Sequence, residues 1–102
     1  MNSEYKKSRW RKFRISILKR DRYICQYFKR YGKTEEANMV HHIFPTETNP
    51  ELFYNPFNLI SLSYKAHELM HDRVTGELTM LGKKLQDKYK DKILEWQERN
   101  KL

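Results

Sequence analysis

Residues 39–50 read MVHHIFPTETNP and place two adjacent histidines, His41 and His42, at the end of a short apolar run. A loop rich in Pro, Thr and Asn follows, so the run predicts a strand over about residues 37–43 that ends before Pro45. Neighbouring side chains on a strand point to opposite faces, so the two imidazoles can take different roles. One can bind a metal ion while the other accepts a proton near neutral pH.

The other two histidines follow within the next stretch of chain. Residues 59–62, LISL, predict a second short strand. Ser63 has the side chain of a helix N-cap and predicts a helix over residues 64–73, which carries both His67 and His71. At i and i+4 their rings share one helix face, a spacing that suits two ligands of one ion. Most histidine pairs with this spacing are surface residues, so the pair alone is a weak signal of a metal site. The adjacent pair His41 and His42 strengthens the prediction.

Basic residues gather in the first third of the chain. The 102 residues carry a net charge of +8, yet residues 1–33 hold 12 Lys and Arg against two acids, and the rest hold 9 against 11. Such a segment predicts binding of a polyanion, most often nucleic acid, with an anionic membrane or a merely soluble basic surface as competing explanations. Apolar residues at helical spacing predict a basic amphipathic helix over about residues 8–21. They are Trp10, Phe13, Ile17 and Leu18.

The remaining segments predict a strand and a helix. Residues 23–28 alternate in a way that predicts a strand or an extended segment. A final amphipathic helix is predicted over about residues 80–99 from five apolar residues at helical spacing, Leu81, Leu85, Tyr89, Ile93 and Trp96. No apolar run is long enough to span a membrane and the N-terminus lacks a signal-peptide core, so a cytoplasmic protein is expected.

The segments VHHIFP, NPFNLISL and YKAHELMH together resemble the HNH, or ββα-metal, nuclease motif. In that motif a histidine pair lies on the first strand, an asparagine opens the second, and a histidine pair lies on the helix. Asn58 precedes His67 by nine residues and His42 precedes it by 25, spacings similar to those of colicin DNases and small phage HNH proteins. The resemblance implies an α+β fold with a ββα-metal core over about residues 37–73, flanked by the two amphipathic helices in a single domain of residues 1–102.

The same resemblance implies a metal-dependent HNH endonuclease that hydrolyses DNA phosphodiester bonds by nicking or double-strand cleavage. His41 is then a metal ligand and His42 the general base, with His67 and His71 as the other ligands. Asn58 would orient the loop and the His42 ring through side-chain hydrogen bonds. The cofactor implied is one divalent ion, Mg, Mn, Ni or Zn.

The implied partner is DNA, expected to be double-stranded, and no membrane is expected. The basic residues would contact phosphates without reading base sequence. Those singled out are Arg9, Arg11, Lys12, Arg14, Lys19, Arg20 and Arg73. The likeness to small phage proteins adds terminase or other packaging proteins as partners and the host cytoplasm as the location.

The sequence departs from the family at one feature. Many HNH proteins have a structural zinc on two Cys-x-x-Cys pairs, and the corresponding positions here are Cys25, Phe28, Ser63 and Ala66. With one thiol left, a four-ligand zinc site is not available, so no structural zinc is expected. Packing of Phe28 with Trp10, Phe13 and the C-terminal apolar stripe is expected to replace it.

Two alternatives to an enzyme stay open at this point. The first is a metal- and nucleic-acid-binding module that does not cut. The second is a helical protein-interaction domain with incidental histidines.

Overall fold

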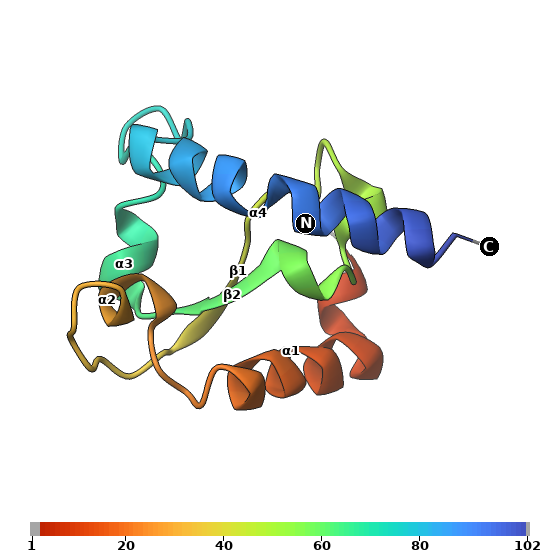
Figure 1. The fold of residues 1–102 in the computed structure, drawn as a ribbon, viewed down its shortest axis with the longest axis horizontal. Coiled ribbons are helices and arrows are strands. Elements are labelled where there is room, and N and C mark those ends of the chain that lie inside the picture. The colour runs from red at the N-terminus through yellow and green to blue at the C-terminus, as the bar shows by residue number, and fades with distance from the viewer. Residues whose placement is uncertain (1–2, 102) are drawn as a thin grey trace.

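The computed structural model describes residues 3–101 and has an antiparallel pair of strands at its centre (Figure 1). Strand β1 (Met39–His42) pairs with β2 (Leu59–Leu62) so that His41 lies opposite Ile60 and His42 opposite Leu59. The helices are α1 (Ser8–Arg20), α2 (Gln26–Lys29), α3 (Tyr64–Glu68) and α4 (Met80–Arg99), with the short 3₁₀ helices η1 (Ser3–Lys6), η2 (Pro50–Leu52) and η3 (Pro56–Asn58). The predicted ββα arrangement with a helix on either side is therefore confirmed.

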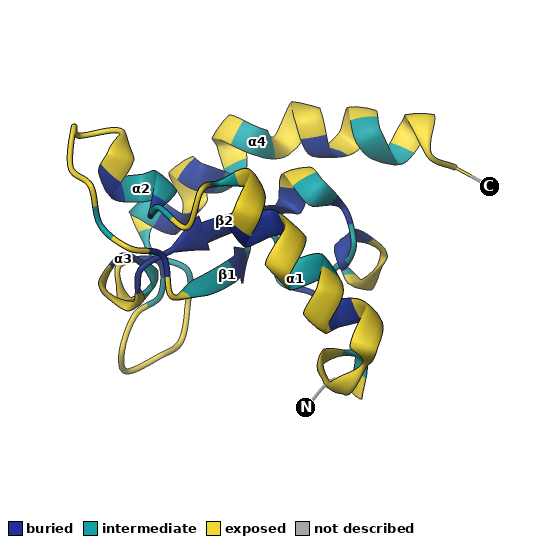
Figure 2. Cartoon of the chain, turned by 90° about the horizontal axis from the view of Figure 1, so that it is seen from below, coloured by how far each residue is buried: buried dark blue, intermediate teal, exposed yellow. Residues whose placement is uncertain are grey.

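Helix α1 packs against both strands. Its apolar residues Trp10 and Ile17 are buried, and they form one cluster with Phe53 and Leu59. The opposite face of the helix is exposed along its length (Figure 2). The carboxylate of Asp21, just after the helix, accepts a hydrogen bond from the Ser61 amide at 3.1 Å and so ties α1 to β2. This is the helix that the apolar spacing predicts.

The other face of the strand pair is covered by α2, α3 and α4. Its core includes Ile60 and Leu62 from β2, Ala66 from α3 and Leu85 from α4. Because residues opposite each other in an antiparallel pair share a face, His41 faces this side with Ile60, whereas His42 faces α1 with Leu59. Within residues 3–101, no helix is long and apolar enough to cross a membrane.

Helix α3 is shorter than predicted. Its start is as expected, because the Ser63 hydroxyl accepts a hydrogen bond from the Ala66 amide at 3.2 Å. The helix ends at Glu68, and His71 lies beyond it, in an isolated antiparallel bridge with Leu78. The prediction of one helix carrying both histidines is therefore wrong.

Helix α3 ends early because Thr79, the N-cap of α4, binds two carbonyls that a longer α3 would need for its own hydrogen bonds. The Thr79 hydroxyl donates to the Leu69 carbonyl at 2.6 Å, and the Thr79 amide donates to the Met70 carbonyl at 2.9 Å. Bonds from Thr79, beyond the reach of helical hydrogen bonding, thus take the place of the next turn. His71 is held by this contact rather than by helix periodicity.

Residues 23–28 do not form the predicted strand. Only Ile24 makes a strand-like bridge, to Glu36, and residues 26–29 form the helical turn α2. This turn places Cys25 and Phe28, three residues apart, in the same core. A short apolar run fits a buried strand or a buried helical turn equally well, and here packing selects the turn.

The positions that correspond to a structural zinc site in relatives are filled by packing. Phe28 and Ala66 lie in one core cluster with Cys25 and Leu85, and the Ser63 hydroxyl lies 3.6 Å from the Cys25 sulfur. The expected partner in α4 is confirmed. The expected partners Trp10 and Phe13 are wrong, because both lie in the separate cluster around Phe53.

Candidate metal centre

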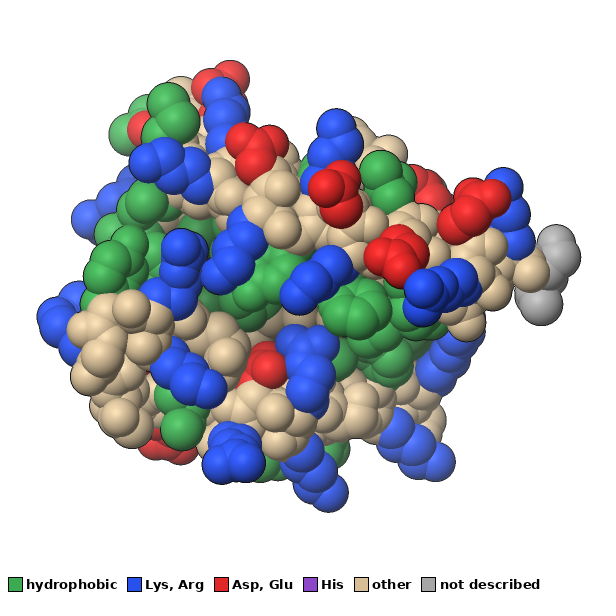
Figure 3. All heavy atoms as spheres, in the orientation of Figure 1, with side chains coloured by type: hydrophobic (Ala, Val, Ile, Leu, Met, Phe, Trp, Pro, Cys, Tyr) green, Lys and Arg blue, Asp and Glu red, His purple; other side chains and the backbone are tan. Residues whose placement is uncertain are grey.

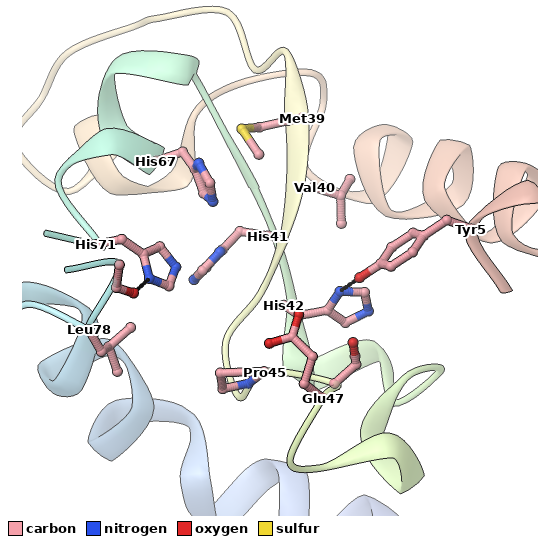
Figure 4. Close-up of a pocket in the computed structure, with 12 residues that line it drawn as sticks. Tyr5, Met39, Val40, His41, His42, Pro45, Glu47, His67, His71 and Leu78 are labelled. Carbon is pink, nitrogen blue, oxygen red and sulfur yellow. Dashed lines mark hydrogen bonds between the residues drawn. The ribbon is translucent and has the colours of Figure 1, made fainter. Parts of the chain in front are cut away.

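Three histidines from different elements meet beside β1. His41 comes from the strand, His67 from α3, and His71 from the segment after α3. Their ring centroids lie 5.1 Å apart for His41 and His67, 5.7 Å for His41 and His71, and 5.6 Å for His67 and His71. One ligand nitrogen of each lies within 4.8 Å of the others. Figure 4 shows the three rings directed toward one another.

The chemistry of the three side chains fits a metal ion. The Nε2 atom of His41 is buried and has no hydrogen-bond partner among the described residues, which is costly unless an ion or water binds there. The Nδ1 atom of His71 lies 3.3 Å from the Gly76 carbonyl oxygen. A carbonyl only accepts, so Nδ1 carries the hydrogen and Nε2 keeps the lone pair that a metal needs. His41, His67 and His71 can therefore hold one metal ion.

The surroundings of His41 and His67 favour the neutral form of these two histidines. Burial, followed by the nearby rings of His67, His71 and His42, lowers the pKa of His41 from 6.5 to about 3. Burial and the neighbouring His71 also lower the pKa of His67, against a raising effect of Glu68. Metal ions bind the unprotonated imidazole, so these ligands are ready at neutral pH without losing a proton first.

His42 lies on the other side of β1 from the three rings (Figure 4). Its Nε2 atom lies 3.1 Å from the Phe53 carbonyl oxygen, which can only accept, so Nε2 carries the hydrogen and Nδ1 is the basic nitrogen of the neutral ring. Burial lowers the pKa of His42, while the Phe53 carbonyl acts in the opposite direction. His42 nevertheless lines the same cavity of about 460 Å³ as His41, His67 and His71.

Asn58 holds the loop between the strands. Its Nδ2 donates to the carbonyls of Phe44 and Leu52, each at 3.2 Å, and its Oδ1 accepts from the Phe44 amide at 2.8 Å. The expected role in orienting the loop agrees with these bonds. The expected hydrogen bond to the His42 ring is not formed, because both ring nitrogens of His42 face other groups. Asn58 is linked to His42 through the backbone, since its side chain binds the Leu52 carbonyl, next to Phe53, and its own carbonyl accepts from the Ile43 amide, next to His42.

The predicted phosphate-binding residues have different surroundings. Lys12 and Lys19 are exposed on α1, and Arg73 is exposed just after His71. Arg9 stacks on the Tyr54 ring, with its guanidinium carbon 3.8 Å from the ring centroid. Figure 3 shows Lys and Arg over much of one face, with most acidic side chains near α4.

Three of the predicted arginines already bond to the protein. Arg11 donates to the Lys6 carbonyl and Arg14 to the Asn38 carbonyl. Arg20 makes the largest set, donating to the carbonyls of Pro56 and Leu59 and to the Asp21 carboxylate. Its guanidinium therefore connects α1 to β2 and η3, and its predicted contact with DNA competes with these bonds.

Several groups around the site carry no signal in the sequence. The carbonyls of Phe53 and Gly76 orient His42 and His71, and a backbone carbonyl has no residue-type preference that a sequence could reveal. The rings of Tyr5 and Trp10 pack against His42 from the N-terminal segment. No spacing links these residues to position 42, since only tertiary folding brings them together.

The similarity to a solved structure agrees with this geometry. No family model matches the chain, and no curated protein matches it either. Among solved structures, the chain is similar to the crystal structure of an HNH endonuclease from the deep-sea thermophilic bacteriophage GVE2 with manganese ion, with 29% sequence identity and a TM-score of 0.63. The similarity covers 65% of this chain and 72% of the phage chain. The predicted resemblance is thereby confirmed: the chain has the ββα-metal fold and is similar to a phage HNH endonuclease.

Proposed function

We propose that the protein is a metal-dependent endonuclease that hydrolyses DNA phosphodiester bonds. The observation that carries the proposal is that the adjacent residues His41 and His42 lie in different surroundings. His41 points toward His67 and His71, and its buried Nε2 has no hydrogen-bond partner in the part of the chain that the structure describes. His42 points away, with one nitrogen fixed by a carbonyl and the other basic. The likeness to an HNH endonuclease with manganese supports the same reaction class.

In this proposal one set of residues binds the metal ion and another accepts the proton during hydrolysis. Bound to His41, His67 and His71, a divalent ion would polarise the scissile phosphate and stabilise the leaving oxygen. His42 is the final acceptor, at Nδ1, of the proton released in the attack, because Nε2 is already protonated and hydrogen-bonded to the Phe53 carbonyl. Burial lowers the pKa of His42, which favours the neutral ring with its lone pair on Nδ1.

Asn58 keeps the strand connection, and with it the Phe53 region, in place for this reaction. It does so through three bonds to backbone groups of the loop. We therefore assign Asn58 a supporting role in the loop rather than contact with His42.

The proposed substrate is double-stranded DNA. Lys and Arg dominate residues 1–33, and exposed members such as Lys12 and Lys19 on α1 can neutralise phosphates without reading bases. The phage source of the similar structure supports a phage origin for this protein as well. A role beside terminase in DNA packaging stays a prediction of the resemblance.

The test is relaxation of a supercoiled plasmid by purified protein with Mn²⁺, Mg²⁺, Ni²⁺ or Zn²⁺, and with EDTA. The wild type is compared with His42→Ala and His67→Ala, prepared in the same way to control for contaminating nucleases. We expect nicked or linear plasmid only with wild type and metal. Metal binding without cleavage by the wild type would instead support a non-cleaving binding module, and equal cleavage by His42→Ala would contradict its role as the base.

A further inference from the structure

The hydroxyl of Tyr5, in η1, lies at the nitrogen of His42 that the proposed reaction uses. The distance from Tyr5 Oη to His42 Nδ1 is 3.2 Å, and Figure 4 shows this contact as a dashed line. Since the Phe53 carbonyl requires the hydrogen on Nε2, the lone pair of the neutral ring is on Nδ1. The Tyr5 hydroxyl therefore donates to Nδ1.

Aromatic rings hold both partners of this hydrogen bond in place. The Trp10 ring stacks on His42 with centroids 5.3 Å apart and planes 24° apart, and the Phe53 ring lies 4.8 Å from His42. The Tyr5 ring packs edge-on against Trp10, with centroids 5.2 Å apart, and lies tilted against Phe53, with centroids 5.0 Å apart. Tyr5 and His42 are thus fixed by the same two rings.

Glu4, the residue before Tyr5, attaches η1 to the rest of the molecule. The Tyr54 hydroxyl donates to the Glu4 carboxylate at 2.6 Å, and Lys7 lies 3.1 Å from the other Glu4 oxygen. The bond from Tyr54 holds η1 beside the loop that supplies Phe53, and the ion pair with Lys7 lies within the N-terminal segment. Tyr5 is 37% exposed and lines the same cavity as His41, His67 and His71.

The position of this hydroxyl has a chemical consequence. An imidazole nitrogen has one lone pair in the ring plane, and Tyr5 already uses it, so a water molecule cannot also donate to Nδ1. A tyrosine hydroxyl, however, accepts hydrogen bonds while it donates one. The attacking water can therefore donate to Tyr5 Oη and remain connected to His42 through it.

We propose that Tyr5 is a catalytic residue that relays the proton from the attacking water to His42. As the water oxygen forms its bond to phosphorus, its O–H bond breaks and the proton passes to Tyr5 Oη. The Tyr5 proton moves at the same time to Nδ1 of His42. The bond from phosphorus to the leaving oxygen breaks with its electron pair going to that oxygen, whose negative charge a divalent ion on the three histidines would stabilise. Tyr5 ends the step as a neutral phenol and His42 as an imidazolium. This inference rests on the proposed nuclease function.

The test uses Tyr5→Phe, which removes the hydroxyl and keeps the ring that packs on Trp10 and Phe53. Tyr31→Phe makes the same chemical change at an exposed tyrosine and serves as the matched control. We expect Tyr5→Phe to lower the single-turnover cleavage rate by about 10²-fold, at the lower end of general acid–base effects, with unchanged affinity for DNA and metal. Tyr31→Phe should cleave like the wild type.

The outcomes separate this inference from the proposed function. If the wild type cleaves and Tyr5→Phe cleaves equally fast, the relay is wrong and the nuclease assignment stands. If Tyr5→Phe cleaves faster, the hydroxyl blocks His42 rather than serving it, which also overturns the relay. If the wild type does not cleave with any of the metals, the proposed function fails and the relay fails with it.

A second readout does not depend on activity. In ¹⁵N-histidine-labelled, metal-free protein, the relay geometry requires His42 to be protonated on Nε2 and to accept a hydrogen bond at Nδ1. Tyr5→Phe should therefore shift the Nδ1 resonance of His42 and leave its tautomer unchanged, whereas Tyr31→Phe should leave both unchanged. An unshifted Nδ1 resonance in Tyr5→Phe would show that the hydroxyl does not contact His42 in solution.

Discussion

His41 and His42 are neighbours in sequence, yet their side chains lie in different surroundings. His41 shares its face of the strand pair with Ile60 and is almost fully buried, with 5% of its surface exposed. His42 shares its face with Leu59 and lies among aromatic rings. The alternation of side chains along a strand was enough to predict this separation. The carbonyl that selects the His42 tautomer could not be predicted, because it depends on the fold of the connecting loop.

Burial of uncharged histidines makes the stability of the metal-free protein dependent on pH. The pKa of His41 is about 3 in the folded chain and 6.5 ordinarily, so between these values the unfolded state binds a proton that the folded state does not. The free energy of unfolding should therefore fall as pH falls below about 6.5. For one such group the loss is about 1.4 kcal/mol per pH unit.

The measurement is urea unfolding in EDTA at pH 7.5 and pH 5 for the wild type and His41→Asn. Removing His41 should make the decrease in stability between these two pH values smaller by about 2 kcal/mol, since a single pKa step of this size acts over about 1.5 units. His42 and His67, whose pKa values are also lowered, leave a residual decrease in the variant. An identical decrease in both proteins would contradict the neutral buried state of His41.

At the scale of elements, the strands and the start of α3 follow from local sequence, whereas the position of His71 does not. The residues of β2 match the predicted range, and Ser63 caps α3 as expected. The pattern around Leu69 and Met70 continues the helical period, but Thr79 binds their carbonyls and ends the helix. A contact made by a residue so far along the chain has no local signal.

The close approach of α4 to Met70 requires glycine at position 82. A Cβ atom at this position would lie 2.7 Å from the Met70 carbonyl oxygen and 2.6 Å from Leu78 Cδ1. The Met70 carbonyl is held by Thr79 and directly precedes His71, so it cannot move without disturbing the metal centre. Alanine normally favours a helix over glycine by up to about 1 kcal/mol, and here the clash outweighs that gain.

Gly82→Ala is therefore expected to lower the free energy of unfolding by about 1–3 kcal/mol, as overpacked sites do. It should also weaken metal binding, since Met70 and His71 must shift together. Chemical unfolding and metal titration check the two effects, with the exposed neighbour changed in Lys83→Ala as the control. A Gly82→Ala protein as stable as the wild type would show that α4 is not packed this closely.

At the scale of the whole molecule, the excess of basic residues includes an exposed helix face. The basic segment of residues 1–33 includes α1, whose outer face is exposed, and most acids lie in the rest of the chain (Figure 3). Composition predicted a surface for a polyanion. It could not separate the cations that are free for phosphates from those, such as Arg20, that already bond to the protein.

Duplex DNA binding at several salt concentrations, in EDTA to prevent cleavage, should distinguish these two kinds of residue. Lys12→Ala and Lys19→Ala should each weaken binding and reduce the slope of log K against log salt by about 1. Arg20→Ala should leave the slope nearly unchanged and should lower the free energy of unfolding, because it removes the bonds to Pro56 and Leu59. An equal reduction of slope in Arg20→Ala would contradict its structural role.

The central claim is that His41 binds the metal and His42 accepts the proton, and the most direct test compares His41→Ala with His42→Ala. Each purified variant is titrated with Mn²⁺ by calorimetry and assayed for plasmid cleavage at saturating metal. We predict that His41→Ala loses both metal binding and cleavage. We predict that His42→Ala binds Mn²⁺ like the wild type and cleaves about 10²-fold more slowly or worse. Loss of metal binding in His42→Ala, or unchanged cleavage in either variant, would contradict the account.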